Sequence, residues 1–190
     1  MKRSSVIGII IVGVILVAVV AGYALNLNRK NKAGEEKAVE STAVQSVLMR
    51  NLEKNYPPTP KEVVKYYAEI TKCFYNEEYT DEELEAMAAK IQEIYDQELI
   101  DNKSQEDYMN DLRTEIADMK QKKYRVSDYV LSASVDVEEF TMDGRACARL
   151  YCTFKIKQGT SGIVPSMEQF ILRKDEDGHW KILGWDLVEE

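Results

Sequence analysis

The hydrophobic residues of this 190-residue chain change their spacing near residue 129, and this change sets the fold class. Up to that point they recur every three or four residues, as in amphipathic helices. Beyond it they alternate with polar residues, as in a strand with one buried face: Tyr129, Leu131, Ala133, Val135 and Val137. We therefore expect an α+β domain in which helices cover one face of a curved antiparallel sheet of about four strands.

Three helix starts are marked by side chains that accept hydrogen bonds from the free amides of a first turn. They are Thr59-Pro60-Lys61-Glu62, with proline at the first helical position, Thr80-Asp81-Glu82-Glu83, and Ser104 with Asp107. Each start is followed by an apolar face: Val63, Tyr67, Ile70 and Phe74; then Leu84, Ala88, Ile91, Tyr95 and Leu99; then Tyr108, Leu112, Ile116 and Met119. The first half of the domain is therefore predicted to be helical.

Turn signals divide the second half into strands. The Asp-Gly pair in Met142-Asp143-Gly144-Arg145 tolerates the positive φ angles of a type I′ hairpin. The returning strand should point six side chains inward: Ala146, Ala148, Leu150, Cys152, Phe154 and Ile156. Phe170 and Leu172 begin a third strand, and a second Asp-Gly turn leads to a fourth with Trp180 and Ile182. Gly184 marks a bulge in that last strand.

An apolar segment precedes the domain. Val6–Leu27 holds 22 residues without a charge, which as a helix would span roughly 33 Å, against about 30 Å of bilayer hydrocarbon. We interpret it as a retained single-pass anchor in the lipid bilayer. The alternative is a cleaved signal peptide ending near Ala21 or Ala24, although such peptides have shorter apolar regions. The predicted organisation is a tail (1–5), the anchor (6–27), a tether with a short helix (28–58) and the domain (59–190).

The charges flanking this segment leave its orientation nearly balanced. Lys2 and Arg3 precede it, and Arg29, Lys30 and Lys32 follow it. The short basic head is similar to that of secretory signals, which favours a domain outside the cytoplasm at the cell membrane.

Composition excludes some classes of protein. The net charge of −8 and the pI near 4.9 argue against a nucleic-acid partner, because phosphate contacts come mainly from clustered Lys and Arg. The chain has three cysteines, Cys73, Cys147 and Cys152, and none of them forms a CxxC pair. We expect free thiols, and the alternative is a disulfide between Cys73 and Cys152. Thirteen acidic residues lie between Asp81 and Asp118, but they do not form the loop sequence of a calcium site. We therefore expect them to form a solvated face, and we expect no metal or cofactor.

The candidate site residues are aromatic. They could line a pocket in the domain interior, although core packing explains the same pattern: Tyr66, Tyr67, Tyr95, Tyr108, Tyr129 and Trp180. His179 is the only histidine, and it should point outward if Trp180 points inward. Asp136 and Glu138 should lie on the outer face of the first strand. No residue is predicted to be catalytic.

Two segments carry a resemblance to known families. The ending Phe170 to Leu187, with Gly178-His179-Trp180-Lys181-Ile182, resembles the last hairpin of nuclear transport factor 2-like (cystatin-like cone) domains. The stretch Asn51 to Pro60, with Tyr56-Pro57-Pro58, is similar to an uncharacterised bacterial family of membrane-anchored proteins with a domain of unknown function. The resemblance implies a cone-like fold, which by itself fixes no activity.

Two functions follow as hypotheses. The first is a membrane-tethered, extracytoplasmic binding or scaffold module without evident catalysis, which meets an envelope protein at high effective concentration. The second is a small-molecule-binding protein or enzyme that uses the interior of the cone. The two differ in whether that interior is filled by side chains.

Overall fold

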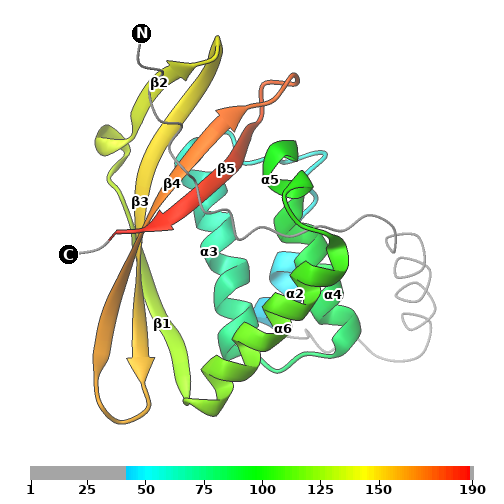
Figure 1. Cartoon of the computed structure of the whole chain (residues 1–190), viewed down its shortest axis with the longest axis vertical. Helices are drawn as coiled ribbons and strands as arrows, with labels where there is room; N and C mark the ends of the chain where they lie inside the picture. The colour runs from blue at the N-terminus through cyan, green and yellow to red at the C-terminus, as the bar shows by residue number, and fades with distance from the viewer. Residues whose placement is uncertain (1–41, 189–190) are drawn as a thin grey trace, which may run out of the picture.

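The computed structural model describes residues 42–188, and these form a layer of helices on one face of a twisted antiparallel sheet (Figure 1). The predicted tail, the predicted anchor and residues 28–41 of the predicted tether lie outside the described residues. Among the residues described, no helix is both long enough and apolar enough to cross a bilayer. The α+β class is confirmed.

The helices are α2 (Ala43–Leu48), α3 (Pro60–Asn76), α4 (Asp81–Gln92), α5 (Gln97–Asp101) and α6 (Gln105–Gln121). Three of the helices, α3, α4 and α6, begin where the capping side chains predicted. Thr59, Thr80 and Ser104 each accept a hydrogen bond from a first-turn amide, and Thr80 forms the complete capping box with Glu83.

The helix expected to run to Leu99 instead ends after Gln92. The next residues leave the helix and lie along the edge of the last strand: Ile182 donates to the carbonyl of Ile94, and Asp96 donates to that of Ile182, each at 2.8 Å. This isolated bridge covers the backbone edge of that strand at Ile182, which would otherwise be open to another chain. Tertiary pairing therefore overrides the continuous helical pattern.

The sheet contains β1 (Tyr124–Leu131), β2 (Glu138–Met142), β3 (Arg145–Gln158), β4 (Ile163–Lys174) and β5 (Trp180–Leu187). The order is β1-β3-β4-β5, and β2 also pairs with β3. β1 and β2 thus follow one another along the same edge of β3, where a single strand was predicted.

The interruption between β1 and β2 has a local cause. Six residues lie between Leu131 and Glu138, whereas only two lie between their partners Cys152 and Arg149, so the chain must loop out. Ser132 bridges the gap, because its hydroxyl accepts from the amide of Tyr151 at 2.9 Å. The prediction that Val135 faces inward was wrong, since it is 91% exposed.

The predicted turn before β3 and the predicted bulge in β5 are both present. Asp143 and Gly144 have φ angles of 51° and 77° in the β2–β3 hairpin. In β5, Gly184 pairs with Ile171 and Ile182 pairs with Leu172, which leaves Leu183 as the extra residue of a bulge. The returning strand differs at its first position, where Ala146 is exposed and Cys147 is buried.

Residues 42–58, predicted as part of the tether, pack on the domain. Val44, Val47 and Leu52 are buried in the same core as α3, and the hydroxyl of Tyr66 donates to the carbonyl of Val47 at 2.9 Å. All buried hydrophobic residues of the described part lie between Val44 and Leu183. Residues 42–58 and the rest of the described chain therefore share one hydrophobic core.

Candidate functional site

The structure separates the six predicted pocket residues. Tyr67, Tyr95 and Tyr108 are buried together between the helices and the sheet. The other three lie in other parts of the same core or against it: Tyr66 contacts α2, Trp180 lies at the start of β5, and Tyr129 on β1 is partly buried. Only half of the predicted set can therefore contribute to one interior site.

Aromatic rings fill the space between α3 and the sheet. The ring of Tyr67 lies 5.1 Å from that of Phe170 and 5.2 Å from that of Trp185. The ring of Tyr95 lies 5.8 Å from that of Trp185, and both tyrosines are at most 7% exposed. These distances are those of packed rings. In this region the tyrosines are therefore core residues.

One acidic side chain that sequence reasoning missed lies at this packed interior. Glu168 on β4 has the same strand parity as Phe170 and Leu172, so it lies on the face that the helices cover. Its Oε2 atom is buried and has no hydrogen-bond partner within residues 42–188. Burial, with a smaller contribution from the charge of Glu115, raises the pKa of Glu168 to about 8. The carboxyl is therefore mostly protonated at neutral pH.

The residues around Glu168 are mainly tyrosines. Tyr75 donates to Oε1 of Glu115 at 2.5 Å. Burial raises the pKa of each tyrosine in this region, and the charges of Glu115 or Glu168 raise it further. We call the following residues the inner-face cluster: Tyr67, Tyr75, Tyr95, Tyr108 and Glu168, with the exposed Glu115 at its edge. The cluster offers the neutral tyrosine hydroxyls and the neutral carboxyl of Glu168 as hydrogen-bond donors. The Glu168 carboxyl can also exchange a proton near neutral pH.

A larger hollow lies outside this interior, between α2, α3 and β1. It has a volume of about 770 Å³. We call it the α2–α3 groove, and its lining residues include Met49, Arg50, Glu69, Lys72 and Tyr129. The ammonium of Lys72 lies 5.9 Å from the centroid of the Tyr129 ring, and Arg50 pairs with Glu69 at 3.3 Å. Met49 is 74% exposed. The groove thus combines both signs of charge with an aromatic and a flexible apolar side chain.

A smaller hollow of about 330 Å³ lies beside the β4–β5 turn. His179 stacks on Tyr56 there, with 4.2 Å between ring centroids, and the hydroxyl of Tyr56 donates to the carbonyl of Trp180 at 2.8 Å. His179 is exposed and Trp180 is buried, as predicted.

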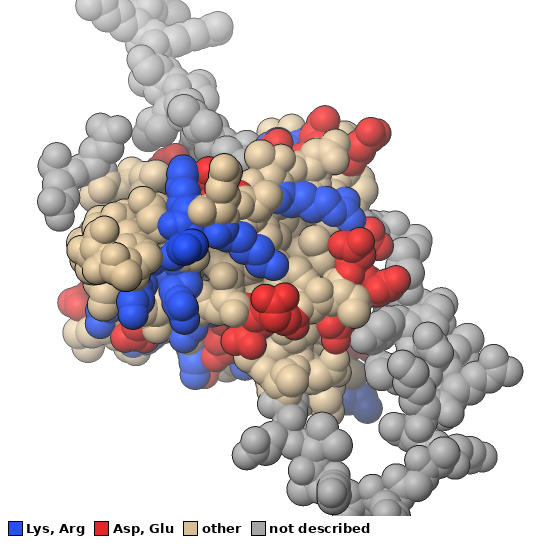
Figure 2. All heavy atoms as spheres, turned by 90° about the horizontal axis from the view of Figure 1, so that it is seen from below, with Lys and Arg blue, Asp and Glu red and all other residues tan. Residues whose placement is uncertain are grey.

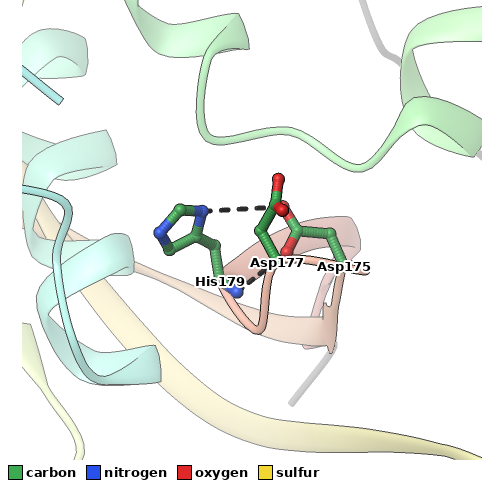
Figure 3. Close-up of side chains that lie close together, drawn as sticks. All are labelled: Asp175, Asp177 and His179. Atoms are coloured by element: carbon green, nitrogen blue, oxygen red, sulfur yellow. Dashed lines mark hydrogen bonds and ion pairs between the residues drawn. The ribbon is translucent and has the colours of Figure 1, made fainter. Parts of the chain in front are cut away.

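The side chains of Asp175, Asp177 and His179 point toward one another at this turn (Figure 3). Their ligand-type atoms lie within 4.8 Å of one another. Asp175 already accepts from the amide of His179 at 2.8 Å and lies 3.8 Å from the ammonium of Lys181. These contacts show that the cluster stabilises the turn, with Lys181 as the cation beside Asp175.

The three cysteines are free, as expected, and all are buried. Burial raises the pKa of Cys73 to about 11 and that of Cys152 to about 12, and it also raises that of Cys147. The thiols are therefore protonated, and none has the low pKa of a nucleophilic cysteine.

Comparison with known proteins gives a family. A family model described as a domain of unknown function, DUF6715, matches residues 1–185. The chain belongs to the DUF6715 family. The expected resemblance to an uncharacterised family is thus confirmed over nearly the whole DUF6715 chain, without an activity attached to it. No curated protein matches this sequence.

Proposed function

We propose that this DUF6715 protein is a binding module of the cone-fold type, tethered to the membrane of a bacterial cell and facing the cell envelope. The uncharged segment Val6–Leu27 supports the tether. The fourteen residues 28–41 between this segment and the domain reach at most about 50 Å when fully extended. A domain held within that distance meets membrane-associated partners at high effective concentration.

The α2–α3 groove is the observation that favours binding over catalysis. It is open to solvent, whereas aromatic rings fill the interior around Tyr67. α2 forms one wall of the groove and is the first described element after residues 28–41, so the groove lies close to the tether in sequence. The exposed Met49 supplies an adaptable apolar contact, and Arg50, Glu69 and Lys72 supply charges around it. These features suit a protein segment with an apolar residue flanked by charges of both signs.

Site-specific crosslinking in the full-length protein tests this function. A photoreactive benzoylphenylalanine at position 49 should capture one envelope protein in cells. The same residue at position 135 is the matched control, because Val135 is also apolar and is 91% exposed but lies outside the groove. Capture of the same proteins from both positions, or of none from position 49, would rule out the groove as the binding site.

Placement of the chain needs a separate experiment. Carbonate extraction should leave the full-length protein in the membrane fraction, and protease added to intact spheroplasts should remove the domain. A domain protected until the membrane is broken would place it in the cytoplasm. A mature chain in the medium would instead indicate a cleaved signal peptide.

A second candidate function is the binding of a small organic cation at the inner-face cluster, and Glu168 is the observation that favours it. A cation would stabilise the ionised form of this carboxyl, and aromatic rings attract quaternary ammonium groups. Binding would require the rings of Tyr67, Tyr95 and Trp185 to separate, because they are in contact. Titration with tetramethylammonium, followed by the ring NMR signals, should show shifts that the Glu168→Gln variant lacks. An absence of shifts up to millimolar concentration would exclude this function.

A further inference from the structure

One end of the domain carries a cluster of positive charge although the whole chain has a net charge of −8. This end contains the turn from α6 to β1 and the hairpin between β3 and β4 (Figure 1). Figure 2 views the domain from this end and shows a run of Lys and Arg side chains crossing it. We call it the basic end and define it by Lys122, Lys123, Arg125, Lys155 and Lys157.

Backbone pairing holds these residues together. Arg125 on β1 is the register partner of Lys157 on β3, and Asp128 is that of Lys155. The amide of Gly159 in the hairpin donates to the carbonyl of Lys123 at 3.1 Å, which joins the hairpin to the α6–β1 turn. The sheet therefore places cations from distant parts of the sequence on one small surface.

Most of this charge is not neutralised locally. Lys122 pairs with Asp118 at 2.7 Å and Lys155 pairs with Asp128 at 3.3 Å. Within residues 42–188, Lys123, Arg125 and Lys157 make no ion pair and are exposed. These five cations and their two paired carboxylates leave an excess of three positive charges, and further Asp and Glu side chains lie elsewhere on the same face (Figure 2).

Apolar side chains extend beyond these cations at the tip of the β3–β4 hairpin. Ile163 is 58% exposed and Val164 is 46% exposed, directly after a turn that contains Gly159 and Gly162. Ile163 is the register partner of Lys157, so an exposed apolar residue lies next to an unpaired cation. Cations around a protruding apolar tip are the combination that binds a lipid headgroup region.

We propose that the basic end docks the domain on an anionic lipid bilayer, with Ile163 and Val164 entering the headgroup region. The proposal rests on the proposed function, because the predicted anchor keeps the domain within about 50 Å of a bilayer. A lipid surface fits better than a nucleic acid because the charge excess is small and local, whereas the rest of the chain is acidic and would repel a long polyanion.

Vesicle co-sedimentation of residues 42–190 tests the docking. This fragment contains every residue of the core that the described part of the chain forms, and cooperative thermal unfolding should confirm that it is folded. We expect it to bind vesicles with about 30% phosphatidylglycerol and to bind pure phosphatidylcholine at least about ten-fold more weakly. Each cation near an anionic surface contributes roughly a five-fold factor in the partition coefficient, so a triple variant Lys123→Gln, Arg125→Gln, Lys157→Gln should bind roughly 100-fold more weakly.

The matched control neutralises Lys54, Lys61 and Lys65, also to glutamine. Lys61 lies at the start of α3, roughly 22 Å along that helix from Asn76, which bonds to Val126 near the basic end. A second variant, Ile163→Ser, keeps the charge and should weaken binding roughly ten-fold by removing the apolar contact.

Three results would overturn the docking: equal binding to both kinds of vesicle, equal losses in the basic-end and control triple variants, or tighter binding to duplex DNA of equal phosphate concentration than to the anionic vesicles. Carbonate extraction of the full-length protein reports the anchor separately. The fragment contains no residue of Val6–Leu27, so failure of the docking and failure of the tether are distinguishable.

Discussion

The raised pKa of Glu168 predicts that the domain loses stability as pH increases through the neutral range. In the unfolded chain this carboxyl ionises near its ordinary pKa of 4.5, whereas in the folded chain it ionises only near pH 8. Between these values the folded state holds a proton that the unfolded state has released, so rising pH favours unfolding. The sign is opposite to that of a carboxylate in an ion pair.

The magnitude follows from the two pKa values. A change from 4.5 to about 8 corresponds to roughly 5 kcal/mol in total, of which about 4 kcal/mol falls between pH 5 and pH 9. This is a large fraction of the roughly 5–15 kcal/mol that typically stabilises a domain. The effect should therefore be visible in ordinary equilibrium unfolding.

Urea unfolding of residues 42–190 and of its Glu168→Gln variant across this pH range measures the effect. The amide of the variant is neutral at every pH, so the free energy of unfolding of the original domain should fall relative to that of the variant by about 4 kcal/mol. Any change in the free energy of unfolding that the amide causes equally at every pH cancels in this comparison. Glu176→Gln is the matched control, since Glu176 is exposed in the β4–β5 turn, and the loss of stability caused by Glu168 should persist in that variant.

A second variant separates the causes. Burial is the main cause of the raised pKa of Glu168, and the charge of Glu115 adds to it. Glu115→Gln should therefore reduce the loss of stability without abolishing it. A difference between the original domain and Glu168→Gln that is constant from pH 5 to pH 9 would refute the reasoning.

Three further substitutions test the packing of the domain by urea unfolding. Asp96→Asn should lower the free energy of unfolding by about 2–4 kcal/mol, because Asp96 accepts two hydrogen bonds from Arg173, whose side chain is only 12% exposed. A loss below about 0.5 kcal/mol would show that other groups stabilise the charge of Arg173. Tyr66→Phe should cost about 1–2 kcal/mol, since it removes the buried hydrogen bond to Val47, and an unchanged stability would contradict the attachment of α2 to α3. Gly178→Ala should cost about 1 kcal/mol because φ is +82° there with open space around the missing Cβ, and a neutral effect would mean that the turn relaxes.

The helix starts could be predicted because capping is local. Thr59, Thr80 and Ser104 accept bonds from amides three residues ahead, so the sequence within one turn determines where each helix begins. The hairpin at Asp143 and Gly144 is local in the same sense, because its φ angles depend on those two residues. The core face of α3 also followed from periodicity, because its four predicted residues, Val63, Tyr67, Ile70 and Phe74, are all buried.

The errors occurred where a distant segment supplied the partner. Ile94 and Asp96 leave the helical pattern to pair with Ile182, which lies more than 80 residues further along the chain. β1 ends because six residues separate it from β2, whereas only two residues separate their partners on β3. This mismatch cannot be seen in the alternation of polar and apolar residues. α2 joins the domain through contacts with α3 and α4, although the proline-rich segment after it had suggested a separate tether.

The same division applies to the candidate sites. The apolar segment Val6–Leu27 and the tyrosines at helical spacing are patterns of adjacent or regularly spaced residues, so the sequence alone predicts a membrane anchor and buried aromatic faces. The isolated carboxyl of Glu168, the α2–α3 groove and the basic end each combine residues from separate elements. Only tertiary packing decides them, because the desolvation of a charge and the summed charge of a surface depend on which side chains are neighbours in space.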